Sequence, residues 1–445
     1  MGTTAAPITA VAPACCALVL GLAGGCREQP HRKSYADPLT LAAAQLVSAS
    51  ASAAAAAGTG PPSAKPAPET EEPPEQAASA AGPSESGPWK VSELFDVGPA
   101  GPATATDSGI VMITKQGELA RAEPVAHKGP AAPDRVRFGQ VAQEPEAFFS
   151  FASGPAVLRD YAYFIAGGRL VRRRLSGEGE PEVLSSDGRT GARVAVVKAA
   201  PNDDDALPAA VAYIAQQNDE LFAKLWVEGA GTYRLSPEGT AANSVALARC
   251  ENGLLAVSLE GRTSMSPLHA RRIRFSNGKP SLEGDVVVWV AGSAQQLTEV
   301  HAVGTPGNHA WAFLPIERDV VQYGLARIHL SIPLQTNSEV SWRNYPNGLD
   351  PAPADCADIC GQPTIAYVRP AEKAPHSPQE LHLAMVAEDG LGPSEVVARS
   401  RAFANVSIAP AANGAIIAYV ADHRTWALGA SCPAATAPKT NRSKR

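Results

Sequence analysis

Histidine is the residue type in this chain best suited to hold a metal or to transfer a proton, but its spacing indicates neither role. No two of the nine histidines stand at a metal-ligand spacing within one turn. They are His31, His127, His269, His301, His309, His329, His376, His382 and His423. The sequence also contains no HExxH, GxSxG, phosphate-binding-loop or EF-hand pattern. It therefore predicts no catalytic residue, no metal and no cofactor.

Paired carboxylates are the other chemistry to consider, because a glycoside hydrolase needs two of them facing each other, roughly 5–9 Å apart. The candidates by loop position are Asp107, Asp160, Asp187 and Asp422. The segment 185–190 around Asp187 resembles the Asp box of sialidases, but it lacks the terminal aromatic residue. The acidic run 202–205 lacks the glycine and the regular spacing of a calcium loop, which favours a solvated loop.

Four of the seven cysteines lie in the aromatic-containing part of the chain. Cys356 and Cys360 stand close together in a segment rich in proline and aspartate, and we predict a structural disulfide between them. Cys250 and Cys432 either pair or stay buried and free, and three pairings of the four cysteines are formally possible.

The N-terminus resembles a bacterial lipoprotein signal peptide. Residues 17–22 form a short apolar segment, and the run that follows ends at Cys26 in the sequence LAGGC. This run resembles a lipobox, in which small residues precede a cysteine that is acylated on sulfur. The resemblance implies that residues 1–26 are an export signal, that Cys26 carries the lipid, and that the lipid bilayer is a partner. Secretion without a lipid is the alternative.

Residues 27–88 have the composition of a spacer rather than of a folded domain. Residues 61–88 contain eight prolines and no aromatic residue, so this stretch cannot bury enough apolar surface to order itself. We expect a disordered Ala/Pro/Ser-rich tether that could span on the order of 100 Å. Residues 433–445 are a basic tail, for which we also expect disorder.

A repeat begins after Trp89. Short apolar strands, most of them with alanine beside a large residue, recur at intervals of 44 to 56 residues. Their central residues are Val111, Tyr163, Tyr213, Val257, Trp311, Tyr367 and Tyr419. Most are followed by a turn and a second strand, as at Gly167-Gly168, whose glycines suit a tight hairpin.

Seven β-meanders of about 49 residues each resemble the blades of a β-propeller. The resemblance implies an all-β fold over residues 89–432, with seven blades that cover each other's apolar faces. Alanine on one side of a strand and an aromatic on the other would fill the wedge between blades. Tandem β-sandwiches are the alternative architecture.

The net charge of −6 gives no reason to expect nucleic acid as a partner, and no apolar run is long enough for a membrane span. We therefore expect a binding module, exported to the bacterial envelope or cell surface, whose partner is a protein or a glycan. An exported glycoside hydrolase or lyase is the alternative. The candidate ligand surface consists of polar and aromatic residues near loop ends, namely His309, Trp311, His423, Arg424 and Trp426.

Overall fold

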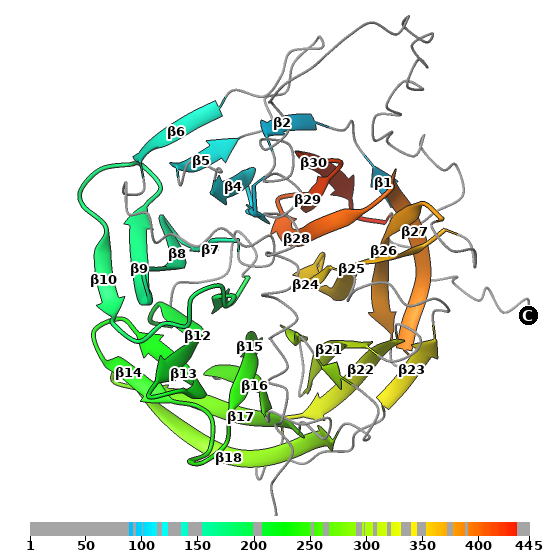
Figure 1. Ribbon diagram of the computed structural model, residues 1–445. Helices are drawn as coiled ribbons and strands as arrows, with labels where there is room; N and C mark the ends of the chain where they lie inside the picture. The colour runs from blue at the N-terminus through cyan, green and yellow to red at the C-terminus, as the bar shows by residue number, and fades with distance from the viewer. Residues whose placement is uncertain are drawn as a thin grey trace, which may run out of the picture. The chain divides into compact units, whose positions relative to one another are not determined.

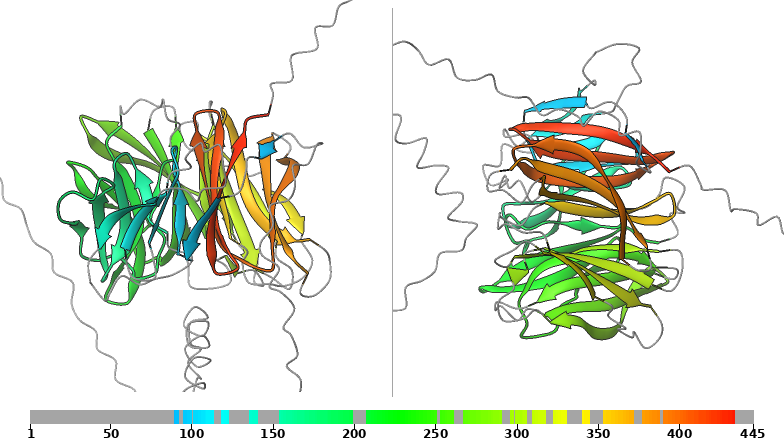
Figure 2. Two further views of the ribbon diagram at one scale, coloured as in Figure 1. Left: turned by 90° about the horizontal axis from the view of Figure 1, so that it is seen from above. Right: turned by 90° about the vertical axis from the view of Figure 1, so that its right-hand side faces the viewer.

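The computed structural model arranges the described strands in seven antiparallel sheets around a common axis, as the blades of a propeller (Figures 1 and 2). The chain divides into two compact units, residues 1–73 and 74–445, and every described residue belongs to the second. The structure describes residues 89–91, 95–99, 101–113, 118–122, 135–140, 154–198, 207–250, 253–260, 267–290, 296–297, 299–305, 309–317, 322–330, 340–344, 353–371, 377–387 and 390–433. The predictions for residues 1–26, 27–88 and 434–445 lie outside these ranges. Within the ranges, no helix is long and apolar enough to cross a membrane.

Each blade is built on a four-stranded antiparallel meander, and in blades 5 and 7 one of the four positions is occupied by two short strands. The blades are numbered here in chain order. Blade 1 holds β3 (Ala103–Ala105), β4 (Ile110–Ile113), β5 (Glu118–Ala122) and β6 (Arg135–Gln140). Blade 2 holds β7 (Ala156–Leu158), β8 (Tyr161–Ala166), β9 (Arg169–Arg174) and β10 (Glu182–Ser185). Blade 3 holds β11 (Ala195–Val196), β12 (Ala210–Gln217), β13 (Glu220–Val227) and β14 (Gly231–Arg234). Blade 4 holds β15 (Ala242–Cys250), β16 (Gly253–Glu260), β17 (Pro267–Ser276) and β18 (Lys279–Val290).

The remaining three blades complete the ring. Blade 5 holds β19 (Gln296–Leu297), β20 (His301–Gly304), β21 (His309–Glu317), β22 (Gln322–His329) and β23 (Val340–Asn344), with β19 and β20 both paired to β21. Blade 6 holds β24 (Ala354–Ile359), β25 (Gln362–Pro370), β26 (Gln379–Ala387) and β27 (Gly390–Ser400). Blade 7 holds β28 (Phe403–Ala411), β29 (Gly414–Ala421) and β30 (Arg424–Ser431), together with β1 (Lys90–Val91) and β2 (Phe95–Pro99). The first strand of each blade lies toward the axis and the last lies at the rim (Figure 1).

The predicted repeat is confirmed, because each of its seven central residues lies in the second strand of its own blade and is buried. Blade 6 shows why alanine and an aromatic alternate there. Ala366 packs in the apolar cluster between blades 6 and 7, whereas Tyr367 packs in the cluster between blades 5 and 6. The small side chain allows close approach on one side, and the ring fills the wedge on the other.

Tight turns join the strands where the sequence indicates them. Gly167 and Gly168 have φ of 55° and 71°, and Asn218 and Asp219 have φ of 49° and 65°. Two consecutive residues with positive φ form the turn whose twist matches the flanking strands. The predicted hairpin between β8 and β9 is therefore confirmed.

The N-terminal strands close the ring. β2 and β1 both pair with β30, so the chain before blade 1 supplies the outer strand of blade 7. Lys90 lies opposite Ser431, and Phe95 lies opposite Ala427. We call the end of the ring that carries Lys90 and Ser431 the proximal face, and the other end the distal face. In each meander, the first and third strands end at the proximal face and the second strand ends at the distal face.

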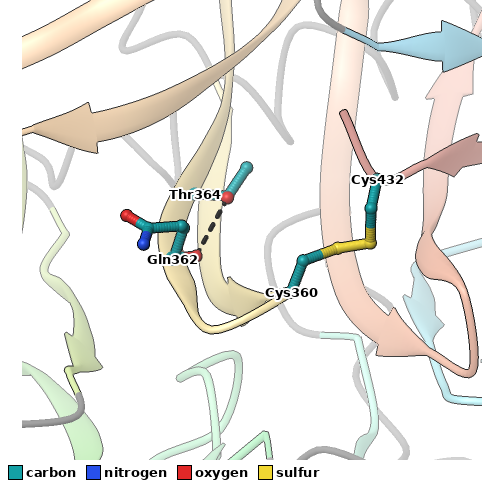
Figure 3. Close-up of a disulfide and its surroundings, with 4 residues drawn as sticks. All are labelled: Cys360, Gln362, Thr364 and Cys432. Carbon is teal, nitrogen blue, oxygen red and sulfur yellow. Dashed lines mark hydrogen bonds between the residues drawn. A yellow bond between two sulfur atoms is a disulfide. The ribbon is translucent and has the colours of Figure 1, made fainter. Parts of the chain in front are cut away.

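The predicted Cys356–Cys360 disulfide is wrong. Cys360 is bonded to Cys432 (Figure 3), with the two Cα atoms 6.2 Å apart. Cys356 is a buried free thiol. The segment taken for an irregular loop is the strand β24, and four residues of extended strand span roughly 13 Å. A disulfide requires Cα atoms less than about 7 Å apart, so Cys356 and Cys360 cannot reach each other. Cys250 is also buried and free.

Candidate functional site

The inner strands meet around the axis, where each would leave an unpaired backbone edge. Side chains of one blade satisfy part of that edge on the next blade. Among the described residues, four side-chain oxygens accept hydrogen bonds from backbone amides of the following blade, at 2.9–3.2 Å. The pairs are Ser244 with Val300, Asp355 with Ile408, Asn405 with Ala103, and Ser407 with Ala105. The axis is therefore a place where polar side chains are held in fixed positions by backbone contacts.

Five charged or titratable side chains gather at this axis, and we call them the axial cluster: Arg193, Lys198, Glu299, His301 and Asp355. Arg193 and Lys198 flank β11 of blade 3. Glu299 and His301 lie at the start of the inner strand β20 of blade 5, and Asp355 lies near the start of β24 in blade 6. Since inner strands begin at the distal face, the cluster lies toward that face.

Asp355 has the most contacts of the five, although its side chain is only 3% exposed. Its Oδ1 accepts a hydrogen bond from Arg193 Nη2 at 2.9 Å. Its Oδ2 accepts one from the backbone amide of Ile408 at 2.9 Å and forms an ion pair with Lys198 Nζ. Lys198 also donates to the carbonyl oxygen of Ile408 at 2.9 Å. One carboxylate thus joins blades 3, 6 and 7.

Arg193 joins Asp355 to the second carboxylate. Its Nη1 donates to Glu299 Oε1 at 2.7 Å and lies 2.9 Å from His301 Nδ1. Because a guanidinium can only donate, this Nδ1 acts as an acceptor and the proton of the imidazole is on Nε2. That Nε2 faces Glu299 Oε2 at 3.5 Å. Arg193 and Glu299 keep 28% and 27% of their side-chain surfaces exposed, against 16% for Lys198, so they are the most exposed members of the cluster.

The electrostatics keep both carboxylates ionised. Burial alone would raise the pKa of Glu299, but the neighbouring His301 and Arg193 outweigh it and lower the pKa to about 2. Burial is likewise outweighed at Asp355, where Lys198 and Arg193 hold the pKa well below its usual range. The positive charges of Arg193 and Lys198 therefore balance the negative charges of Glu299 and Asp355. Among the described residues, no group of three or more His, Cys, Asp or Glu side chains is arranged to hold a metal ion.

The five residues of the predicted ligand surface do not come together. His309 begins β21 of blade 5, where its Nε2 lies 2.7 Å from Arg327 Nη2. Trp311 is buried between blades 5 and 6, with the Arg327 guanidinium 5.8 Å from its ring centroid. Trp311 is thus a core residue.

The other three residues of that surface belong to blade 7. His423 lies in the turn between β29 and β30 with a φ of 59°, followed by the exposed Arg424. Trp426 is partly buried against the core of blades 6 and 7, and its Nε1 donates to the carbonyl of Ala421 at 3.3 Å. His423 follows the second strand of blade 7 and therefore lies at the distal face. His309 begins the second strand of blade 5 and therefore lies at the proximal face, so the two histidines are at opposite ends of the ring.

The four candidate aspartates are also divided between the faces. Asp107 and Asp160 are exposed in turns after first strands, at the proximal face, whereas Asp422 lies in a distal turn. Asp187 follows β10 and accepts hydrogen bonds from Ser185 Oγ at 2.6 Å and from the Tyr213 hydroxyl at 3.1 Å. An ion pair with Lys224 also helps to lower its pKa against the effect of burial. The segment that resembled an Asp box therefore fastens the connection between blades 2 and 3 to blade 3.

None of the five axial residues was predicted as part of a site from the sequence. Only His301 was named there, as one of the nine histidines. The partners lie 106, 162 and 157 residues apart in the chain. The available signal was Asp355, a carboxylate next to a cysteine in a segment that folds as an almost entirely buried strand.

Comparisons with known proteins give no information beyond the fold. No protein-family model matches the chain, and no curated protein is similar to it. Among solved structures, the Swd1 β-propeller domain from Myceliophteria thermophila is 9% identical and has a TM-score of 0.42, over 75% of this chain and 99% of that one. BBS1N, solved in complex with ARL6DN, is 12% identical with a TM-score of 0.44, over 78% of this chain and 98% of that one. The Aleuria aurantia lectin, solved with α-methyl-L-fucoside, is 12% identical with a TM-score of 0.34, over 61% of this chain and 90% of that one. None of these matches extends beyond the fold that the seven sheets already show.

Proposed function

We propose that this protein is an exported, N-terminally anchored β-propeller that binds a protein or glycan ligand and performs no catalysis. The observation that supports a binding role is the internal pairing of the axial cluster. The charged groups that converge on the axis are bonded to one another and to the backbone of Ile408 in blade 7. Such a cluster holds a ring rigid, and a rigid ring presents its connecting loops to a ligand.

The Cys360–Cys432 disulfide supports export. Disulfides form and persist in oxidising compartments, such as the bacterial periplasm and the cell surface, and are rare in the cytosol. A lipid on Cys26 would hold the chain at a membrane, and residues 27–88 would separate the propeller from it.

The N-terminus of the mature protein tests the anchor. The full chain is expressed in a bacterium, and the recovered protein is analysed by mass spectrometry together with a Cys26→Ser variant. We expect wild-type protein to begin at an acylated Cys26, and the variant to keep its leader or lose the lipid. Recovery of wild-type protein with an intact Met1 would contradict both export and lipidation.

The alternative function, a carbohydrate-active enzyme, is favoured by one observation, namely that Glu299, Asp355 and His301 converge at the axis. A glycosidase, however, needs one carboxyl group that stays protonated at working pH, which requires a raised pKa. Both axial carboxylates have lowered pKa values and are bonded to Arg193, which favours binding over catalysis.

One experiment separates the two functions. Purified full chain is incubated with a panel of polysaccharides, and both retention of the protein and release of reducing ends or unsaturated products are measured. Retention without product release is expected for a binding module. Product release that disappears in a Glu299→Gln variant, which remains folded by circular dichroism, would instead assign an enzyme.

A further inference from the structure

The outer strand of blade 7 is described in two pieces, β1 and β2. Among the described residues, β2 pairs with the first half of β30, and β1 pairs through Lys90 and Val91 with its last two residues. Strand pairing of two residues is weak by itself, because few hydrogen bonds offset the entropy of ordering the chain. Contacts other than these two pairs therefore matter for the position of β1.

Two features lie at this point. Trp89 precedes β1, is only 2% exposed, and packs in the apolar cluster between blades 6 and 7 that also contains Ile359. Cys432 follows the last residue of β30 and is bonded to Cys360, the residue after Ile359 (Figure 3). The disulfide therefore fastens the end of β30 to the β24–β25 turn of blade 6, next to the residue against which β1 pairs.

The packing of Trp89 is not fully favourable. Its indole Nε1 is buried with no hydrogen-bond partner among the described residues. A buried donor without an acceptor costs free energy that water would return if the side chain were exposed. Trp89 shares its apolar cluster with Ile359 of β24 and Ala430 of β30, the two strands whose ends the disulfide joins.

The rest of the closure does not involve the disulfide. Thr425 of β30 exchanges hydrogen bonds with both backbone groups of Gly101, and Asn405 and Ser407 of β28 bind blade 1. These contacts lie on the β2 side of blade 7 and along its inner strand. None of these four hydrogen bonds involves Cys360 or Cys432.

We propose that Cys360–Cys432 is a redox-sensitive latch on the β1 segment. A dithiol reductant would break the S–S bond, supply two electrons and two protons to form two thiols, and itself become a cyclic disulfide. Reduction would then release Trp89–Val91, while the end of β30 keeps its pairing with β29 and the seven-bladed ring stays closed through β2 and the inner strands. The latch is a property of the ring and holds whether or not the protein is exported.

Hydrogen–deuterium exchange of the full chain, with and without dithiothreitol, tests this latch. We expect exchange to increase about tenfold in peptides that cover residues 89–91 after reduction, with β2, β28, β29 and the other blades unchanged. A Cys360→Asn variant should show the same local increase without reductant and no further change with it. Asparagine suits the positive φ of 58° at this position, so the turn is kept.

A Cys250→Ala variant is the matched control, because it removes a buried thiol far from the latch. It should respond to dithiothreitol as the wild type does. No change on reduction, or a uniform increase across all blades, would overturn the proposal. The first result would mean that packing alone holds β1, and the second that the disulfide stabilises the whole ring.

Discussion

At the scale of single residues, Asp355 is the side chain on which the axial contacts converge. It accepts hydrogen bonds from Arg193 and the Ile408 amide and pairs with Lys198, and these partners come from blades 3 and 7. A buried carboxylate of this kind costs desolvation, which its partners offset. Its removal therefore leaves two cations without their main anion in a site that excludes most solvent.

An Asp355→Asn variant measures this effect. We expect the free energy of unfolding in urea to fall by about 3–5 kcal/mol, because Arg193 and Lys198 lose the compensating charge. An Asp422→Asn variant in the β29–β30 turn is the control and should change stability by less than about 0.5 kcal/mol. A loss equally small for Asp355→Asn would show that the axial cluster does not hold the ring.

His382 predicts how stability depends on pH. Its ring is buried in blade 6, where Arg369 Nε donates to Nε2 at 2.7 Å and Nδ1 lies 3.2 Å from Ser394 Oγ. Glu380 and Arg399 are the other charged groups nearby. Burial first, and then the charge of Arg369, lower the pKa of His382 to about 4.

The unfolded chain binds a proton at His382 near pH 6.5, whereas the folded chain binds it only near pH 4. Between these two pH values, the unfolded state therefore holds more protons than the folded state. Stability should therefore be complete above pH 6.5 and decline by up to about 3 kcal/mol as the pH falls to 4. A His382→Gln variant should flatten this part of the urea-derived stability profile. An unchanged slope in the variant would assign the effect to other groups.

At the scale of elements, close approach between neighbouring strands decides where side chains fit. Gly304 ends β20 of blade 5, and a Cβ atom built on it would overlap the carbonyl oxygen of Arg249 in β15 of blade 4. Backbone atoms on both sides leave no flexible group that could move away. The contact between the two inner strands therefore requires glycine at this position.

A Gly304→Ala variant should consequently lose about 3 kcal/mol of stability in urea unfolding. Gly229→Ala provides the comparison, because Gly229 has a φ of 73° and open space around its Cβ position. That substitution should cost only about 1 kcal/mol, the price of a left-handed backbone. Equal losses would show that backbone conformation, rather than the contact with blade 4, limits the site.

The sequence predicts elements well where a local rule governs them. Tyr163, Tyr367 and the other repeat centres are buried because period-two alternation and turn residues specify strand and face together. The prediction from the sequence fails for the disulfide of Cys356 and Cys360. The distance between two nearby cysteines depends on whether the segment between them is a loop or an extended strand, and their spacing in the sequence does not reveal this. The prediction fails at the axial cluster for a different reason. Lys198 meets Ile408 across 210 residues, and only closure of the ring brings them together.

At the scale of the whole molecule, the ring depends on the N-terminal strands. Val97 of β2 is 1% exposed and belongs to the core shared by blades 7 and 1. Without β2, blade 7 would have three strands and a free edge on β30. Residues before Trp89 lie outside the described residues, and their composition predicts no packed core.

Two truncations test this division. Removal of residues 1–88 should leave the thermal unfolding midpoint nearly unchanged, whereas removal of residues 1–100 should lower it by at least about 10 °C. Differential scanning calorimetry provides the measurement. A chain without residues 1–100 that melts like the full-length protein would show that three strands suffice for blade 7.

Since Lys90 and Ser431 are cross-strand neighbours, the two ends of the folded region could be joined by a short peptide. New ends could then be opened at the tight turn of Asn218 and Asp219, which is exposed between β12 and β13. In such a circular permutant, the outer strand of blade 7 would follow β30 directly in the chain, whereas in the natural chain it comes from the opposite end of the sequence. It would leave the former junction free for fusion of another protein.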